Sequence, residues 1–221
     1  MLLKLKVILN FLLEIILPSK CLGCKKRQEI LCSDCLDRID KAERETEKDI
    51  LALYDYRNPI IKDAIWKLKY YHKGIIGQKL GQVLFIEFLE EIYSLKTFNE
   101  GSPIYVIPVP ISQERKRSRG YNQTEIIAKS FCNQTDKNVL KIKTNIIFKN
   151  KNTIPQAKLT NRNKRLKNIK GAFEIKNREE IKNKIIIIID DVTTTGGTML
   201  EIINLLKKSG AKKVIGFAVA H

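Results

Sequence analysis

The chain has 221 residues, of which 43% are apolar. This is enough for one sizeable α/β domain with a small extra module, and it argues against extended disorder. Lysine and arginine number 41 against 24 aspartates and glutamates, so the formal net charge is +17. The excess favours a polyanionic partner, such as nucleic acid, a phosphorylated metabolite or an acidic membrane face. A composition rich in Lys, Asn and Ile also arises from an AT-rich genome, whatever the protein does.

The first 20 residues combine apolar and charged side chains in a helical pattern. Apolar residues recur at close to helical spacing from Leu2 to Ile15, and Pro18 should end the helix nearby. Charged side chains interrupt the apolar run, which is too short to span a bilayer, and no small-residue cleavage site follows. We therefore expect an amphipathic helix that docks on the rest of the protein, with a membrane or partner surface as the alternative.

Four of the five cysteines lie between residues 21 and 35, in the pattern C-x2-C-x7-C-x2-C. Each C-x2-C makes a tight knuckle that points two thiolates at one centre, and two knuckles supply the tetrahedral set of sulfurs that zinc favours. Two disulfides are the alternative, which is uncommon in an intracellular protein. The spacing thus predicts a zinc site that stabilises the fold and takes no part in catalysis. The predicted ligands are Cys21, Cys24, Cys32 and Cys35.

From about residue 51 onward, strand-like and helix-like segments alternate. Strands separated by helices of ten or more residues favour a mostly parallel sheet with helices on its faces. The isoleucine run at 185–189 has no polar alternation, as expected of a strand that is buried on both faces. We expect two domains, a helix with the cysteine module over 1–48 and an α/β domain over 49–221. The expected strands are Leu51–Tyr56, Ile104–Ile107, Ile146–Phe148, Ile185–Ile189 and Val214–Val219, and the expected helices are Pro59–Tyr71, Ile75–Tyr93, Gln123–Cys132 and Thr198–Lys208.

Two aspartates and a loop rich in threonine and glycine follow the isoleucine strand. Ligands of open parallel sheets bind at the carboxyl ends of strands, near helix N-termini whose free N–H groups attract anions. Gly196 and Gly197 let backbone amides approach a phosphate, and the threonine hydroxyls add donors. Asp190 and Asp191 would repel a second phosphate, but they suit the 2′ and 3′ hydroxyls of a ribose, or a hydrated Mg²⁺. The segment predicts a ribose 5-phosphate site; an N-capping turn in an ordinary α/β unit is the alternative.

The segment IIIIDDVTTTGGT resembles the phosphoribosyl pyrophosphate (PRPP) motif of type I phosphoribosyltransferases. Over most of its length the chain also resembles the ComF (ComFC) family, which is associated with competence for DNA uptake. The supporting motifs, besides the cysteine module, are IWKLKYYHK at 65–73, PVP at 108–110, RSRGYNQ at 117–123, PQAKL at 155–159 and RLKNIKGAF at 165–173. The resemblance implies an α/β fold with the mostly parallel, Rossmann-like sheet of type I phosphoribosyltransferases and a small N-terminal zinc module.

The resemblance also implies a reaction in which Mg²⁺ and PRPP bind together and a nitrogen nucleophile replaces pyrophosphate. By position, Asp190 and Asp191 are the catalytic pair on the ribose diol, and the loop after strand 104–107 faces the pyrophosphate. Lys164 and Arg165 fall where these enzymes often carry a mobile lid. The implied phosphate-binding residues are Val192, Thr193, Thr194, Thr195, Gly196, Gly197 and Thr198. The implied residues of the pyrophosphate loop and its basic surroundings are Pro108, Val109, Pro110, Arg115, Lys116, Arg117, Arg119, Lys164 and Arg165.

No residue pattern identifies an acceptor base, so the sequence leaves the reaction open. The family association adds a role in handling imported single-stranded DNA during natural transformation. The basic residues, with tyrosines such as Tyr70, Tyr71 and Tyr121, fit such DNA by charge and stacking. The implied partners are PRPP or another ribose phosphate, single-stranded DNA and helicase-type competence proteins. The implied location is cytoplasmic, with peripheral contact to the inner face of the membrane. The alternatives are an orphan nucleotide-salvage phosphoribosyltransferase without a DNA role, and a non-catalytic nucleic-acid-binding protein that retains the PRPP fold.

Overall fold

The computed structural model describes residues 19–27, 29–42, 49–71, 73–97, 99, 101–150 and 169–221. The helix expected at the N-terminus therefore falls almost wholly outside the described residues. The expected lid residues Lys164 and Arg165 lie outside them as well. Within the described ranges, no helix has both the length and the hydropathy that a membrane span requires.

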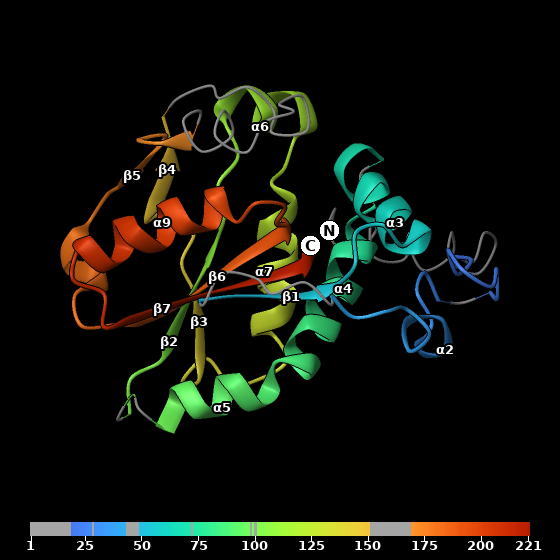
Figure 1. The fold of residues 1–221 in the computed structure, drawn as a ribbon, viewed down its shortest axis with the longest axis horizontal. Coiled ribbons are helices and arrows are strands. Elements are labelled where there is room, and N and C mark those ends of the chain that lie inside the picture. Colours follow the sequence, from blue (N-terminus) through green and yellow to red (C-terminus); the bar gives the residue numbers. More distant parts are fainter. Residues whose placement is uncertain are drawn as a thin grey trace, which may run out of the picture.

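A five-stranded sheet forms the centre of the molecule, in the order β1-β7-β6-β2-β3 (Figure 1). Its strands are β1 (Ile50–Tyr54), β2 (Ile104–Pro108), β3 (Leu140–Ile142), β6 (Ile185–Val192) and β7 (Lys213–Ala220). All four strand pairs are parallel, which confirms the predicted sheet. In the middle strand, Ile187 pairs with Val106 on one side and with Ile215 on the other. The strand β6 is therefore hydrogen-bonded to a neighbouring strand on each side.

Helices cover both faces of this sheet, as the unbroken isoleucine run predicts. The helices are α2 (Ser33–Leu36), α3 (Pro59–Tyr70), α4 (Gly74–Glu87), α5 (Leu89–Thr97), α6 (Gln113–Arg119), α7 (Gln123–Cys132), α9 (Gly197–Lys208) and the 3-10 turn η2 (Arg178–Ile181). Ile185, Ile187 and Ile189 face one apolar core, which α3, α4 and α7 cover, while Ile186 and Ile188 face a second core under α9. This alternation makes all five isoleucines buried.

Two elements differ from the sequence-based expectation. The helix expected over Ile75–Tyr93 is divided at Phe88 into α4 and α5, and the Phe88 ring stacks on Phe217 of β7 with centroids 4.4 Å apart. The strand expected at Ile146–Phe148 is β4 (Ile147–Lys149), which lies outside the main sheet. It pairs antiparallel with β5 (Phe173–Ile175) instead. Both differences come from packing between segments that are distant in sequence.

The helices α4 and α7 pack closely against each other on the first core. A Cβ atom at Gly81 of α4 would lie 2.4 Å from the carbonyl oxygen of Ile127 in α7. No side chain fits at that distance, so the glycine sets the spacing of the two helices. This packing also fixes the N-terminus of α7, which reaches the candidate site described below.

The cysteine module packs against the α/β domain. Its apolar residues Ile30, Leu31, Leu36 and Ile39 belong to the same buried core as Leu53 of β1. Figure 1 shows the module and α2 at the end of the molecule next to α3. The module therefore contributes to the main core besides holding its cysteines.

Candidate functional site

Two buried carboxylates stand at the carboxyl end of β6. The side chains of Asp190 and Asp191 belong to residues that are only 8% and 4% exposed. The N–H of Asp191 donates to Oδ1 of Asp190 at 2.8 Å. Beyond them the Thr193 N–H donates to the carbonyl oxygen of Ala220 at 2.9 Å, which ties the loop to β7. The predicted acidic pair thus occupies a rigid position between two strands.

The loop that follows these carboxylates leads directly into α9. Gly196 caps that helix with φ of 70°, a left-handed conformation that glycine adopts without strain. Within the part of the chain that the structure describes, two buried oxygen atoms have no hydrogen-bond partner here, Oδ2 of Asp191 and Oγ1 of Thr195. Buried oxygens are nearly always paired, so these two indicate that a bound group completes the site. The free N–H groups at the start of α9 add an attraction for anions.

The electrostatics of the pair depend on a lysine that the sequence reasoning did not assign. Lys69, near the end of α3, places its Nζ 3.1 Å from Oδ1 of Asp191. Burial lowers the pKa of Lys69, but the charge and hydrogen bond of Asp191, together with the charge of Asp190, outweigh burial and leave this pKa raised. Burial and the neighbouring Asp191 raise the pKa of Asp190 to about 8. Lys69 therefore balances the charge of Asp191, while the surroundings of Asp190 favour its protonated form.

A second lysine approaches the site from β4. Burial lowers the pKa of Lys149, and the charge of Arg115 lowers it further, whereas Asp190 raises it. Lys149 also lines a cavity of about 520 Å³ between α6 and the end of β4. The lining residues are Gln113, Glu114, Arg117, Ser118, Lys149 and Asn150. The cavity therefore has two basic side chains and one acidic side chain in its lining, and Lys149 links it electrostatically to Asp190.

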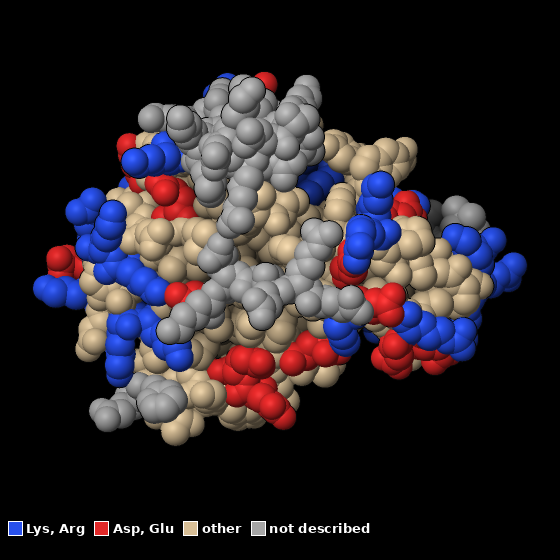
Figure 2. Space-filling model, viewed as in Figure 1, with Lys and Arg blue, Asp and Glu red and all other residues tan. Residues whose placement is uncertain are grey.

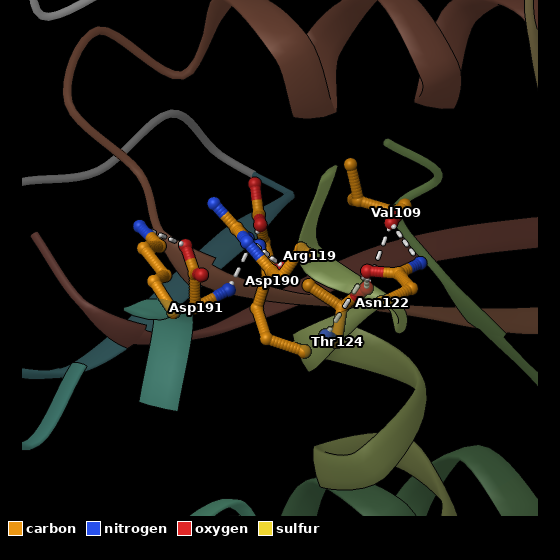
Figure 3. A network of polar contacts seen from close by, with 8 residues as sticks. Val109, Arg119, Asn122, Thr124, Asp190 and Asp191 are labelled. Carbon is orange, nitrogen blue, oxygen red and sulfur yellow. Dashed lines mark hydrogen bonds and ion pairs between the residues drawn. The ribbon is translucent and has the colours of Figure 1, made fainter. Parts of the chain in front are cut away.

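The loop after β2 is the one predicted to face pyrophosphate. Two polar residues at the start of α7 hold it in place. The Val109 N–H donates to the carbonyl oxygen of Ile189 at 2.9 Å, so the loop lies directly beside β6. The Val109 carbonyl accepts from Nδ2 of Asn122 at 3.1 Å and from Oγ1 of Thr124 at 2.7 Å (Figure 3). Pro108 and Pro110 flank this anchored residue. Sequence reasoning missed Asn122 and Thr124, although Asn122 lies in the motif RSRGYNQ.

The four basic residues of α6 do not share one environment. Arg117 lines the cavity and Arg115 acts on Lys149, whereas Lys116 pairs with Glu125 of α7 at 3.8 Å. Arg119 donates to Oε1 of Gln123, and its guanidinium carbon lies 5.4 Å from the ring centroid of Tyr70. Figure 3 shows Arg119 in the same network of polar residues as Asp190 and Asp191. The structure thus places Arg117 in the lining of the cavity, brings the charge of Arg115 to bear on Lys149, and directs Arg119 to Tyr70 of α3.

The predicted phosphate-binding residues run from the end of β6 through a short loop into the start of α9. Val192 still belongs to β6, where it pairs with Ala220 and packs against the apolar core. Thr193 and Thr195 are followed by the two glycines, and Gly197 is already in α9. The sequence order therefore places the hydroxyls of this loop between the acidic pair and the helix N-terminus.

The four cysteines of the module form a separate cluster. Their sulfur atoms all lie within 4.8 Å of one another, and Sγ of Cys32 is 3.5 Å from Cys21 and 3.6 Å from Cys24. Tetrahedral zinc, with Zn–S distances of about 2.3 Å, holds its sulfurs roughly 3.8 Å apart. All four thiols are free, which disfavours the disulfide alternative. The donor set therefore fits a metal such as zinc.

The raised pKa of Cys32 also indicates that this cluster suits a bound cation. The backbone of Cys35 lowers the pKa of Cys32, but burial and the three neighbouring thiols outweigh it and raise that pKa to about 12. Four thiolates cannot share this space without a cation.

A Cβ atom at Gly23 would lie 2.7 Å from Sγ of Cys35, so the first knuckle accommodates only glycine without a shift.

The fold and the acidic pair define the class of protein. Residues 114–221 match the phosphoribosyl transferase domain, which includes β6, the loop and α9. The chain is thus an α/β protein with a parallel sheet of the phosphoribosyltransferase type, as predicted.

Similar curated proteins narrow this class. The chain is 28% identical to Competence protein F of Haemophilus influenzae, over 86% of this chain and 78% of that protein. It is 27% identical to the DNA utilization protein YhgH of Escherichia coli K12, over 83% of this chain and 74% of that protein. It is 28% identical to Competence protein ComFC of Streptococcus pneumoniae, over 92% and 81%. The chain thus has homologues named for competence and DNA utilization over most of its length, in agreement with the resemblance seen in the sequence.

Proposed function

We propose that the chain binds PRPP, or a related ribose 5-phosphate, at the carboxyl end of β6. The observation that carries this proposal is the buried pair Asp190 and Asp191 just before the start of α9, with an unpartnered buried oxygen on Asp191 and another on Thr195 of the loop. Oδ2 of Asp191 accepts from a ribose hydroxyl, and Oγ1 of Thr195 donates to the 5′-phosphate. The N–H groups at the start of α9 complete the phosphate site.

The pyrophosphate group of the ligand enters the basic cavity in this proposal. Lys149 and Arg117 supply positive charge there, and the anchored Val109 presents the loop after β2 to the same region. Lys164 and Arg165 complete this basic set as proposed lid residues. Mg²⁺ bound with the ligand supplies further charge for the pyrophosphate, and oxygen ligands of the kind found here suit it. Because Asp190 holds a proton at neutral pH, ligands that need its ionised form bind more tightly as the pH approaches 8.

The role of the site is handling of imported single-stranded DNA in the cytoplasm, with phosphoribosyl transfer to an acceptor as its reaction class. The names Competence protein F and DNA utilization protein, borne by homologues over most of the chain, support this role. The proposal includes structural zinc on the four cysteines and a boundary between a module over 1–48 and a domain over 49–221. It also includes contact with helicase-type competence proteins and with the inner face of the membrane. The alternative function is that of a nucleotide-salvage phosphoribosyltransferase without a DNA role.

Thermal denaturation with PRPP and Mg²⁺ tests the ligand. A ligand at 100 times its dissociation constant stabilises the fold by about 2.7 kcal/mol, so the wild-type melting temperature should rise by several degrees. The double variant Asp190→Ala/Asp191→Ala should show no rise. Glu179→Ala, which removes an acid with an 89% exposed side chain, should respond like the wild type. An equal rise in the double variant would refute the site.

Pyrophosphate release in the presence of a panel of free bases and single-stranded DNA then tests the reaction. Release that requires a free base and ignores DNA would favour the salvage transferase. Release that requires DNA supports the proposed role. Ligand binding without release from any member would identify a non-catalytic nucleic-acid-binding protein.

A further inference from the structure

An exposed aromatic cluster at the end of α3 has no part in the fold or in the ribose-phosphate site. Trp66, Tyr70 and Tyr71 are 47%, 59% and 56% exposed. The Trp66 ring lies 5.9 Å from the Tyr70 ring and 4.9 Å from the Tyr71 ring, centroid to centroid. Trp66 and Tyr70 are four residues apart and share the outer side of the helix. Grouped exposed rings of this kind mark a binding surface rather than chance exposure.

The helix that carries this cluster is fixed firmly to the domain. Its inner side buries Ile61, Ala64, Ile65 and Leu68 completely in the main core. The hydroxyl of Tyr121 donates to the carbonyl oxygen of Leu68. The rings are therefore preorganised, because the helix below them cannot turn without breaking buried packing.

The cluster is joined directly to the acidic pair. Lys69, the residue before Tyr70, forms the ion pair with Asp191. Arg119 stands over the Tyr70 ring and is anchored to Gln123 at the start of α7. Figure 1 shows α3 and α6, which carry these contacts, near the carboxyl end of the sheet. The helix α3 thus carries both the aromatic cluster and the lysine that pairs with Asp191.

The chemistry of the cluster selects its occupant. Exposed rings with a guanidinium over one of them bind the π-faces of nucleobases, while the guanidinium binds the phosphate between bases. On the face shown in Figure 2, most lysine and arginine side chains among the described residues lie toward the two ends of the molecule, with acidic and uncharged residues between them. That distribution does not form one long track, which favours a short segment of strand held by stacking.

We propose that Trp66, Tyr70 and Tyr71, with Arg119, form a stacking site for a few bases of single-stranded nucleic acid beside the ribose-phosphate site. This inference rests on the proposed function, because it gives the DNA-handling role a location. A base on Tyr70 would stack on the same helix that carries Lys69, the ion-pair partner of Asp191.

Trp66 provides a direct probe, because it is the only tryptophan in the chain. Titration with an oligothymidylate of about 12 nucleotides should quench its fluorescence and protect it from acrylamide. Tyr70→Ala should weaken binding roughly tenfold, since one stacked base is worth a factor of about 5 to 150. Trp66→Phe keeps a ring and should retain most of the affinity, whereas Trp66→Ala should not. Tyr93→Ala removes a 62% exposed tyrosine from α5 and should bind normally.

Three outcomes would overturn the inference in distinguishable ways. Binding of a labelled oligonucleotide with unchanged Trp66 emission, and equal affinity for Tyr70→Ala, would place the strand elsewhere and leave the proposed function intact. The mononucleotide dTMP quenching Trp66 as strongly and as tightly as the oligonucleotide would make the cluster a site for free nucleotides. No oligonucleotide binding at low salt would remove both this site and the DNA role, while the PRPP thermal shift would still stand or fall by itself.

Discussion

The cysteine cluster and the aspartate pair both crowd groups that become anionic, yet the protein balances them differently. Around Cys32, the described residues supply three further thiols within 4.8 Å and the pKa is raised to about 12. Around Asp191, the fold supplies Lys69 at 3.1 Å, and Asp190 remains largely protonated at neutral pH. The first arrangement needs a permanent cation from outside. The second has its counter-charge within the fold, although Oδ2 of Asp191 is still without a hydrogen-bond partner among the described residues.

The largest expected effect comes from breaking the cysteine cluster. Cys32→Ser removes the sulfur that lies closest to two others, and we expect loss of bound metal and a strongly lowered melting temperature. Structural zinc contributes on the order of 10 kcal/mol of apparent binding free energy in small zinc peptides. Elemental analysis should find about one zinc ion per wild-type chain and none in the variant. Cys132→Ala, outside the cluster, should keep its metal; a fully metallated Cys32→Ser would contradict the four-sulfur site.

The next effect tests the resident counter-charge of the aspartate pair. Lys69→Met leaves Asp191 buried without its cation, so the free energy of unfolding should fall by about 3–5 kcal/mol. Millimolar Mg²⁺ should raise the melting temperature of this variant more than that of the wild type. Lys67→Met, on the same helix and paired at the surface with Asp63, should change stability by less than about 1 kcal/mol. Equal losses in both variants would show that Lys69 is an ordinary helix residue.

A third effect concerns the proton on Asp190. Its pKa rises from 3.8 in the unfolded chain to about 8 in the fold, so the folded state holds the extra proton between these values. Stability from this group is present at low pH and is lost as the pH rises from about 4 to about 8, by up to about 1.4 kcal/mol per pH unit.

The variant Asp190→Asn cannot ionise at this position, so it should not lose stability from this group as the pH rises. Denaturant unfolding from pH 5 to pH 9 should therefore show the variant gaining stability relative to the wild type as the pH increases. Glu179→Gln, an exposed acid, should follow the wild-type curve. Parallel curves for Asp190→Asn and the wild type would mean that Asp190 ionises normally in the fold.

The smallest effect sharpens the geometry of the cysteine module. Gly23→Ala adds a methyl group 2.7 Å from Sγ of Cys35, which should cost about 1–3 kcal/mol and loosen the metal. Gly74→Ala meets nothing closer than 3.9 Å at the start of α4, so it should be neutral or slightly stabilising. Competition with a chelator measures metal retention in both. A Gly23→Ala protein that holds zinc as firmly as the wild type would show that the knuckle adapts.

The features that the sequence predicted are those with a local cause. The isoleucine run identifies β6 because burial on both faces permits no polar alternation, and Asp190 and Asp191 follow it directly. The spacing of the four cysteines likewise predicts that their sulfur atoms meet in one cluster. Lys69 and Lys149 could not be placed in this way, because their approach to the aspartates depends on where α3 and β4 lie in the folded molecule.

The same distinction explains the errors in the fold. The break between α4 and α5 at Phe88 depends on Phe217, a residue far along the chain. The short strands β3 and β5 have three residues each and acquire their structure from partners, so their own sequence gives little signal. The motif IWKLKYYHK contained the clue to Lys69 and the aromatic cluster, but only as a family landmark.

The strand order has a consequence for how the protein is made. β7, from residues 213–220, lies between β1 and β6, and within the described sheet β1 has no other strand partner. On the ribosome, the cysteine module and β1 emerge early, yet β1 must wait for almost all of the chain before it can pair. Metal capture by the module can therefore precede closure of the sheet. An interrupted translation product ending before residue 213 would expose an edge of β6, whose five isoleucines are buried in the complete fold, and should aggregate.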